Sequence, residues 1–357
     1  MINEKEELGK IRVQLDNLDD ELLKLLNKRM ELVHQVGVIK AKSGGAIYRP
    51  ERERAILDRL EKNNKGLLNR SAIEALFLEI FAISRNLELP ENIAYLGPEG
   101  SFTHQAAESR FGAMSAYLPI NSIKGIFEEV ANKKAKYGVV PIENSSNGIV
   151  SDTITSLTEY NLKIIAEVMV DVHFAFATNC DQIKDIKKIY SKDIAFEQCH
   201  RFLENHGLYN IELIPVESTA KAVKLAKDEV GSAAICSHVG AKMYGLPILF
   251  EDIEDSGNNR TRFVIISDFE NASSGNDKTS IFAQVPDRQG ALVELLTDFD
   301  KNGINLTKIK SHIVEGISTF FIDFDGHKDD QNVKNVFQRH ESSIKYLGSY
   351  VKEADDI

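Results

Sequence analysis

The sequence lacks several features that would place it in familiar classes of protein. Its three cysteines, Cys180, Cys199 and Cys236, lie far apart and form no Cys-x-x-Cys pair, so neither a disulfide framework nor a zinc site is indicated. No run of about 18 apolar residues predicts a membrane span. The N-terminal stretch MINEKEELGK is polar and acidic, which is not typical of a signal peptide. We therefore expect a cytoplasmic protein with reduced thiols.

An excess of positive charge is also missing. The net charge is −11 and the sequence pI is about 5.4, which argues against nucleic acid as a partner. Residues 1–90 nevertheless carry 16 Lys and Arg against 15 Asp and Glu, so a local basic pocket is possible there. No glycine-rich fingerprint or metal-ligand cluster is present, and we expect neither a metal nor an organic cofactor. The length of 357 residues suggests two or three domains.

The first 90 residues have the pattern of an all-helical domain. One helix is predicted from about Glu6 to Lys42, and about 35 helical residues span about 50 Å, longer than a small domain is wide. The stretch Ser43 to Gly45 ends this helix, Pro50 suits the first turn of a second, and Asn69 precedes a third. Two short helices cannot cover one so long, which predicts a dimer.

One position in the apolar seam of the long helix is an arginine. Arg29 interrupts a heptad-like series made of Leu15, Leu18, Leu22, Leu25, Leu32, Val36 and Ile39. Lys40 lies within about 20° of Arg29 around the helix and about 16 Å along it. An unpaired buried guanidinium is costly, so the pattern indicates a site for a small dicarboxylate. The alternative is that these cations extend from solvated faces.

From Ile93 onward, strands alternate with helices, which predicts an α/β domain of two lobes with a cleft. Small polar residues follow strands in three stretches, residues 97–104, 139–148 and 216–222. Helix N-termini at such points favour anions, although Ser, Thr and Asn are also ordinary N-caps there. Residues 267–278 have the composition of a linker. After it, the order strand, helix, strand, strand, helix, strand predicts a ferredoxin-like domain.

Residues 5–90 resemble the all-helical, intertwined-dimer class of chorismate mutase. The resemblance rests on a set of charged and polar positions, namely Arg12, Arg29, Lys40, Arg52, Glu53, Ser84 and Glu88. It implies that Arg29 and the partner chain's copy of Arg12 clamp substrate carboxylates. Lys40 would donate to the ether oxygen and Glu53 would bind the ring hydroxyl. Two positions depart from the pattern, because Arg49 stands where some members have an acid and Glu88 where some have Gln.

Residues 93–268 resemble prephenate dehydratase, with the two-lobed fold of periplasmic binding proteins. The resemblance rests on GPEGSFTHQAA, VPIENS, YSKDIAFEQC and the TRF motif at Thr261. It implies that Thr261 is catalytic, close to the departing ring hydroxyl. Further implied substrate-binding residues are Ser101, Thr103, Asn144, Ser145, Gln198, Ser218, Thr219, Arg262 and Phe263. Lys192 and Asp193 replace the usual His-Pro of this family.

Residues 278–357 resemble an ACT domain, a ferredoxin-like regulatory module. The GAL element Gly290, Ala291 and Leu292 would bind phenylalanine at a dimer interface, together with Asn305, Leu306 and Ser311. Lys310, His312 and Ile313 replace the Glu, Arg and Pro that are usual beside that serine. We expect phenylalanine to bind and inhibit; the alternative is a domain kept only for dimerisation.

Together these resemblances predict a bifunctional enzyme of phenylalanine biosynthesis with three domains at residues 1–90, 93–268 and 278–357. It would convert chorismate to prephenate, and prephenate to phenylpyruvate, CO2 and water, as a homodimer or larger homo-oligomer. Two alternatives remain open. In one, the helical domain only dimerises a dehydratase. In the other, the cleft domain is a sensor that binds an amino acid without reacting.

Overall fold

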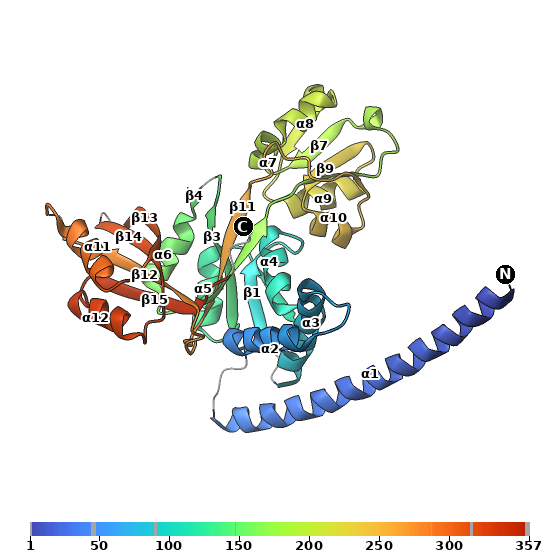
Figure 1. The fold of residues 1–357 in the computed structure, drawn as a ribbon. Coiled ribbons are helices and arrows are strands. Elements are labelled where there is room, and N and C mark those ends of the chain that lie inside the picture. The colour runs from blue at the N-terminus through green and yellow to red at the C-terminus, as the bar shows by residue number, and fades with distance from the viewer. Residues whose placement is uncertain are drawn as a thin grey trace.

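The protein, described here as a computed structural model, is seen at residues 2–43, 48–88, 91–146, 148–286, 288–314 and 317–353. The three predicted N-terminal helices are confirmed as α1 (Ile2–Ser43), α2 (Pro50–Asn63) and α3 (Arg70–Glu88). Figure 1 shows α1 projecting far beyond the rest of the chain, with α3 against its C-terminal half. Gly44 and Gly45, where a helix break was predicted, lie outside the described residues.

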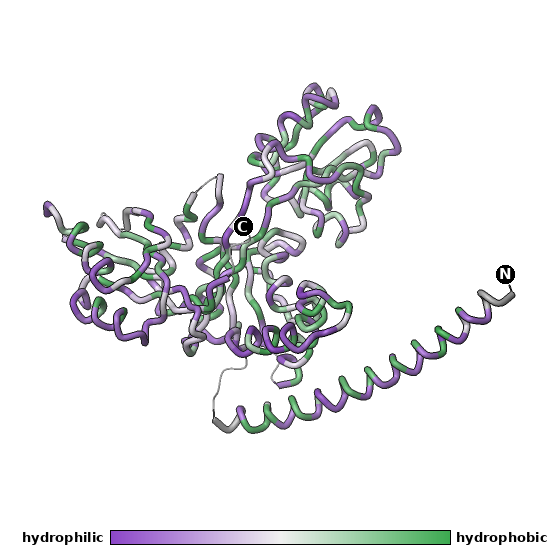
Figure 2. Tube along the Cα trace, in the orientation of Figure 1, coloured by the Kyte–Doolittle hydropathy of each residue, from purple (hydrophilic) through white to green (hydrophobic). Residues whose placement is uncertain are grey.

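Helix α1 packs against α3 through one narrow face only. Gly37 is buried there, because a Cβ at this position would lie 2.9 Å from the Cα of Glu88, so only glycine permits so close an approach. The predicted leucine seam faces solvent instead, with Leu25 66% and Leu32 57% exposed. Figure 2 shows apolar residues recurring along the whole projecting helix. A single chain therefore leaves most of this apolar surface uncovered.

The central domain has the two predicted lobes. The first lobe is a sheet in the order β2-β1-β3-β11-β5, with β4 paired to β3. The strands are β1 (Asn92–Leu96), β2 (Ala116–Ile120), β3 (Tyr137–Asn144), β4 (Gly148–Ile149), β5 (Lys163–Asp171) and β11 (Arg260–Ser267). Its helices are α4 (Phe102–Phe111), α5 (Ile123–Ala131) and α6 (Ser151–Glu159). β1 is parallel to β2 and β3, whereas β11 runs antiparallel to β3 and β5.

The second lobe is a sheet in the order β10-β6-β9-β7-β8. Its strands are β6 (Ala175–Thr178), β7 (Lys188–Ser191), β8 (Glu212–Pro215), β9 (Ser232–Cys236) and β10 (Ile248–Phe250). The helices are α7 (Asp193–Gln198), α8 (His200–Asn205), α9 (Thr219–Asp228) and α10 (His238–Tyr244), with short 3-10 turns at Ile183–Asp185 and Leu208–Asn210. The chain enters this lobe after β5 and returns by β11, so the two lobes are joined by two crossings.

The C-terminal domain has the predicted ferredoxin-like order. It consists of β12 (Asp277–Gln284), α11 (Ala291–Lys301), β13 (Leu306–Val314), β14 (Ile317–Asp325), α12 (Gln331–Arg339) and β15 (Ile344–Val351). The antiparallel sheet runs β13-β14-β12-β15. The helices pack over an apolar core that includes Leu295, Phe299 and Val336.

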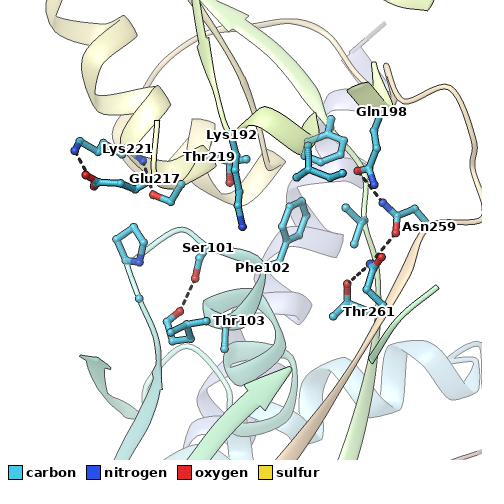
Figure 3. A pocket seen from close by; sticks show the side chains of 18 of the residues that line it. Ser101, Phe102, Thr103, Lys192, Gln198, Glu217, Thr219, Lys221, Asn259 and Thr261 are labelled. Carbon is cyan, nitrogen blue, oxygen red and sulfur yellow. Dashed lines mark hydrogen bonds and ion pairs between the residues drawn. The ribbon is translucent and has the colours of Figure 1, made fainter. Parts of the chain in front are cut away.

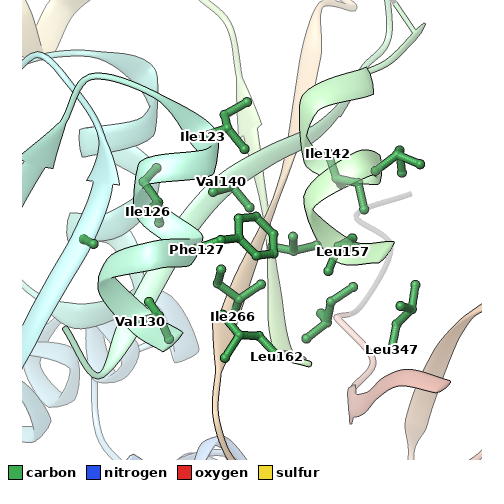
Figure 4. Close-up of a cluster of buried hydrophobic side chains, with 14 of the residues drawn as sticks. Ile123, Ile126, Phe127, Val130, Val140, Ile142, Leu157, Leu162, Ile266 and Leu347 are labelled. Carbon is green, nitrogen blue, oxygen red and sulfur yellow. The ribbon is translucent and has the colours of Figure 1, made fainter. Parts of the chain in front are cut away.

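The segment 267–278, which has the composition of a linker, is packed between the central and C-terminal domains. Asn271 is buried and its Nδ2 donates to the carbonyls of Ile165 in β5 and Ser349 in β15. The apolar core also continues across the boundary, since Phe282, Phe321, Leu347 and Tyr350 share one cluster with residues of β3, β5, β11, α5 and α6. Figure 4 shows Leu347 beside this cluster. Asn271 is therefore a hydrogen-bond donor between the two domains.

Candidate active sites

The packing of α1 on α3 brings together four of the residues predicted for a mutase site. The Nη1 of Arg29 donates to the Oγ of Ser84 at 2.5 Å, and the Nζ of Lys40 lies 2.9 Å from the Oε2 of Glu88. Both residues from α1 lie on one face, and Ser84 and Glu88 are i, i+4 on α3, as the spacing predicts. The two cations are about three helical turns apart on α1, whereas their partners are about one turn apart on α3, so the long side chains of Arg29 and Lys40 converge on one helix–helix contact.

The charge of Arg29 is not neutralised in the described part of the chain. Its guanidinium makes no ion pair among the described residues, and the ring of Phe81 lies 6.0 Å away. Desolvation lowers the pKa of Arg29, and the charge of Glu88 opposes that shift. A half-buried guanidinium without a counterion is an attractive position for a carboxylate brought by a ligand.

The remaining predicted mutase residues are not part of the two pairs between α1 and α3. Arg12 and Arg52 are exposed, and Arg12 lies on the part of α1 that projects away from α3. Glu53 differs from the prediction that it faces the substrate, because it is ion-paired with Arg85 of α3. Desolvation raises the pKa of Glu53 against the opposing charges of Arg85 and Arg110. Glu53 meets Arg85 away from Ser84 because successive side chains on a helix differ by about 100° in direction. Arg85, the residue after Ser84, therefore faces the central domain.

The second candidate site is a cleft of about 970 Å³ between the two lobes of the central domain. The first lobe contributes residues from the loop before α4 and from the ends of β3 and β11. The second lobe contributes α7 and the N-terminus of α9. Figure 3 shows these side chains facing one another across the cleft. Of the predicted dehydratase residues, those that line it are Ser101, Thr103, Asn144, Gln198, Ser218, Thr219 and Thr261.

A chain of hydrogen bonds joins the two lobes at the cleft. Asn144 Nδ2 donates to the Oγ1 of Thr261 at 2.8 Å and to the Oδ1 of Asn259 at 2.8 Å. Asn259 Nδ2 in turn donates to the Oε1 of Gln198 at 3.0 Å. Asn259 was missed by the sequence reasoning. It stands two residues before Thr261, and the period of two in a strand would have placed both side chains on one face.

The direction of these hydrogen bonds leaves the Thr261 hydroxyl proton available. The backbone N–H of Ser146 donates to Asn144 Oδ1 at 3.0 Å, which fixes the amide so that its NH2 group points at Thr261. Thr261 Oγ1 therefore accepts, and its own proton can be donated to another group. Thr261 pairs with Asn144 across β11 and β3, and a register shift follows between Arg262 and Phe263. Such irregularities often re-aim side chains at active sites.

Two helix N-termini face the cleft, and their hydroxyl residues are both N-caps and part of the cleft lining. Ser101 and Ser218 are the N-caps of α4 and α9, where their Oγ atoms accept from the N–H groups of His104 and Lys221. Thr103 and Thr219 are buried in the first turns of these helices. Lys192, the residue that replaces the usual histidine, also lines the cleft, as do Lys221 and Lys224. The site is therefore suited to an anion.

Three predicted dehydratase residues are outside the lining of the cleft. Ser145 Oγ donates to the carbonyl of Asn258 and accepts from the N–H of Arg260. Phe263 is 1% exposed and belongs to the core beneath the sheet. Arg262 differs most from its predicted contact with substrate, because its guanidinium lies in the boundary with the C-terminal domain. Strand alternation explains this, since Arg262 and Thr261 point to opposite faces.

The residues predicted to bind an effector lie at the start of α11 and along β13. Gly290, with φ of 85°, is the N-cap of α11, a backbone conformation that favours glycine. Ala291 is buried behind it, and Leu292 and Leu306 both pack against the domain core. Asn305 donates to Asp325, and Ser311 is exposed. Their role in binding remains a prediction.

One cluster could in principle hold a metal ion, although the sequence spacing did not indicate it. Ligand atoms of His173, Asp252 and Glu254 lie within 4.8 Å of one another. His173 Nδ1 is 2.6 Å from Glu254 Oε1, and the other oxygen of Glu254 accepts from the N–H of Phe174. The hydrogen bond that His173 donates to Glu254 raises the pKa of His173. The ion pair of His173 with Glu254, at the crossing between the lobes, therefore already explains why these side chains lie close together.

Comparison with known proteins agrees with this organisation. Family descriptions match the chain in three places: Chorismate mutase type II at residues 11–89, Prephenate dehydratase at 93–271 and ACT domain at 279–341. A prephenate dehydratase from Arthrobacter aurescens, solved in complex with L-Phe, is 33% identical with a TM-score of 0.67 and covers 73% of this chain and 90% of its own. The fold and cleft are thus those of a prephenate dehydratase carrying a mutase-type helical domain and an ACT domain.

Full-length relatives share all three parts. A bifunctional chorismate mutase/prephenate dehydratase from Aquifex aeolicus is 39% identical over 97% of this chain and 98% of its own length. One from Pseudomonas aeruginosa is 37% identical over 98% of this chain and 99% of its own. The chain belongs to the family of bifunctional chorismate mutase/prephenate dehydratases. No helix in the described residues is long and apolar enough to cross a membrane.

Proposed function

We propose that this chain converts chorismate to prephenate at the contact of α1 and α3, and prephenate to phenylpyruvate in the interlobe cleft. The observation that carries the proposal is the hydrogen-bonded series Gln198–Asn259–Asn144–Thr261, which ends on a hydroxyl with a free proton. A non-reacting amino-acid sensor has no need of a donor arranged in this way. The dehydratase needs one, because a hydroxide is a poor leaving group without a hydrogen-bond donor.

In the dehydratase step, Thr261 donates a hydrogen bond to the departing ring hydroxyl of prephenate. The carboxylate on the ring leaves as CO2 and its bonding electrons enter the ring as the C–O bond to the hydroxyl breaks. The departing hydroxyl takes a proton through Thr261 and leaves as water, and Thr261 regains its proton from solvent. Because Thr261 accepts from Asn144, its own O–H bond is polarised and is a stronger donor. The N-termini of α4 and α9, with Lys192, hold the carboxylates of the substrate. Aromatisation provides the driving force.

In the mutase step no bond to the protein forms, so the site contributes orientation and fixed charges. Arg29 binds one carboxylate of chorismate, and Lys40 donates to the ether oxygen where negative charge gathers. Ser84, which accepts from Arg29, holds that guanidinium in place. Glu88 is paired with Lys40 as a carboxylate, so it can donate to the ether oxygen only after it gains a proton.

The mutase site is completed by a second copy of the chain. The leucine seam of α1 is more than half exposed at Leu15, Leu18, Leu22, Leu25 and Leu32. Burial of apolar area at about 25 cal/mol per Å² favours covering such a helix along its length. An antiparallel partner α1 would cover the seam and bring its Arg12 to the site near Arg29. Arg12 would then clamp the second carboxylate.

We also propose that phenylalanine binds the C-terminal domain and inhibits the dehydratase. The support is the ACT-type fold, the Gly290–Leu292 element at the N-terminus of α11, and the L-Phe complex of the Arthrobacter relative. Replacement of the usual acidic and basic neighbours by Lys310 and His312 alters the charge of this region. A shift in melting temperature on adding phenylalanine tests the binding, and no shift at millimolar phenylalanine would contradict it.

One incubation tests both activities. Chorismate is added to the full chain, and chorismate, prephenate and phenylpyruvate are quantified over time, with and without phenylalanine. We expect phenylpyruvate to form from chorismate alone. Unchanged chorismate alongside conversion of added prephenate would reduce the helical domain to a dimerisation element. Conversion of neither compound would favour the sensor.

A further inference from the structure

The catalytic pair of the cleft has a matching pair on the opposite face of the same strands. Thr261 pairs with Asn144 across β11 and β3, and the next residues, Arg262 and Glu143, pair with each other. Because side chains alternate along a strand, one pair faces the cleft and the other faces away from it. Both members of the second pair make ion pairs with the C-terminal domain.

Arg262 is held from three directions in the domain boundary and is 4% exposed. Its Nη1 donates to Asp323 Oδ2 of β14 at 2.6 Å and its Nη2 to the hydroxyl of Tyr350 in β15 at 2.8 Å. Its Nε donates to Glu167 of β5 at 2.8 Å. Ser280 of β12 contacts both Asp323 and Tyr350, so three strands of the C-terminal sheet meet at this guanidinium.

Glu143 is tied to a different strand of the same domain. Its carboxylate accepts from the Nζ of Lys308 in β13, and the Nζ of Lys310 lies 3.8 Å away. The side chains of Glu143 and Lys308 are 17% and 29% exposed, so the pair is partly shielded from solvent. Lys308 stands on the strand that also carries the predicted effector residues Leu306 and Ser311.

These ion pairs are poorly explained as a means of holding the domains together. Taking charges out of water costs several kcal/mol per ion, and apolar residues of similar volume often stabilise as well or better. An apolar core already joins the domains through Phe282 and Leu347. At Gly348 a Cβ would lie 2.0 Å from the carbonyl oxygen of Ile164, so β15 sits directly on β5. What the charges add is a fixed direction for the two strand ends.

We propose that Arg262 and Glu143 are positioning residues that tie Thr261 and Asn144 to the C-terminal domain. A change in the position of β13, β14 or β15 then moves the two strand ends together, and with them the Asn144–Thr261 hydrogen bond. The consequence for regulation rests on the proposed function, whereas the mechanical link does not. Each is tested by its own measurement.

The test removes the contacts from the C-terminal side, because a variant of the buried Arg262 may not fold. Lys308→Met removes the nearer of the two lysines at Glu143. Tyr350→Phe removes the hydroxyl that accepts from Arg262 and keeps the ring. Lys308→Arg restores the charge. The matched control is Lys345→Met, which removes another lysine of the same interface, one that donates to the carbonyl of Thr158 in α6 at 2.6 Å. That contact lies away from Thr261 and Asn144.

Hydrogen exchange, measured without substrate or effector, tests the mechanical link. In Lys308→Met and Tyr350→Phe we expect backbone amides of residues 142–146 and 257–262 to exchange about threefold faster or more, because local opening becomes easier. Lys345→Met and Lys308→Arg should match the parent chain in these segments. Equal exchange in Lys308→Met and Lys345→Met would overturn the proposal. This result is obtained whether or not the chain turns over prephenate.

Kinetics then tests the consequence. We expect Lys308→Met to lower kcat for prephenate about fivefold with KM within about twofold, since orientation and not binding is affected. Phenylalanine should still raise the melting temperature of this variant, yet about tenfold more phenylalanine should be needed for half-inhibition. Loss of phenylalanine binding together with inhibition would assign Lys308 to the effector site and overturn the coupling role. A parent chain inert toward prephenate would refute the proposed function instead.

Discussion

The two candidate sites are built on opposite plans. In the interlobe cleft, every predicted residue that lines the wall belongs to one chain, and neutral amides and a hydroxyl are joined in a continuous series. At the α1–α3 contact, the recognition groups are charged, and Arg12 lies far along a helix that projects from the molecule. On the proposed function, the first site is complete within one chain, whereas the second is completed by another copy.

This difference follows from the chemistry proposed for each site. A dehydration needs a hydrogen-bond donor at the oxygen of the leaving hydroxyl, and the end of a rigid sheet can supply one. A pericyclic rearrangement needs a folded dicarboxylate surrounded by cations, and an unpaired cation is costly to bury in a single chain. A site assembled at a helix–helix contact leaves Arg29 half-exposed until substrate and partner arrive. The following predictions separate the two plans.

The largest effect is expected at Thr261. Thr261→Val keeps the shape of the side chain but removes the donor, and we expect dehydratase kcat to fall by roughly 10²–10⁴-fold. Mutase activity should stay within about twofold, because the sites share no residue. Phenylpyruvate formation from prephenate and loss of chorismate are measured on the same preparation. Retention of more than a tenth of the dehydratase rate would exclude Thr261 as the essential donor.

Mixing two inactive mutase variants tests whether that site spans two chains. Arg29→Ala and Arg12→Ala should each reduce mutase activity about 10²-fold or more, as loss of a charge-assisted contact to substrate implies. Mixed after unfolding and refolding together, they should recover roughly a quarter of parent activity, because half of the dimers then hold one intact site. A mixture no more active than its components would mean that Arg12 acts within its own chain.

Asn259 tests the continuity of the hydrogen-bonded series. In Asn259→Ala, Asn144 loses one of its acceptors and the oxygen of Gln198 loses its donor. We expect dehydratase kcat to fall about 10-fold, consistent with about 1–3 kcal/mol for an unsatisfied buried group. Ser145→Ala is the control, since Ser145 is adjacent but outside the cleft lining. Equal losses in both variants would indicate general damage to the strand ends.

The smallest effect concerns the pH profile of the mutase. Glu88 accepts a hydrogen bond from Lys40 as a carboxylate, and a carboxylate has no proton to donate to the ether oxygen. We expect mutase activity to rise toward acid pH, and Glu88→Gln to flatten that rise by supplying a permanent NH2 donor. Rates are compared between pH 5 and 8, with melting temperature followed in parallel. Identical profiles for the two chains would remove Glu88 from the reaction.

Much of the architecture was predictable from the sequence, because periodic patterns and family motifs extend over each domain. The helices, the alternating lobes and the ferredoxin-like order are as predicted. Arg29, Lys40, Ser84 and Glu88 met as their spacing implied. The inferences about side-chain direction failed at two positions in recognisable motifs. Glu53 pairs with Arg85 of its own helical domain, and Arg262 pairs with Asp323 of the C-terminal domain. A motif identifies a position, whereas the partner of its side chain depends on contacts distant in sequence.

The role of the segment between the last two domains was also hidden in the sequence, for a related reason. Residues 267–278 are rich in Ser, Asn, Asp and Gly, which is equally typical of a loose connection and of a segment satisfying buried backbone groups. Asn271 follows the second course, because its Nδ2 donates to the carbonyls of Ile165 and Ser349. Only the tertiary structure shows which carbonyls need those donors.

The exposed seam of α1 has a consequence for how the two reactions respond to dilution. If one site exists only in the dimer, mass action links its abundance to the square of the free chain concentration. The cleft site carries no such dependence. At chain concentrations below the dissociation constant of the α1–α1 contact, the protein would keep consuming prephenate while making little of it. The ratio of the two activities would then report how much of the protein is paired.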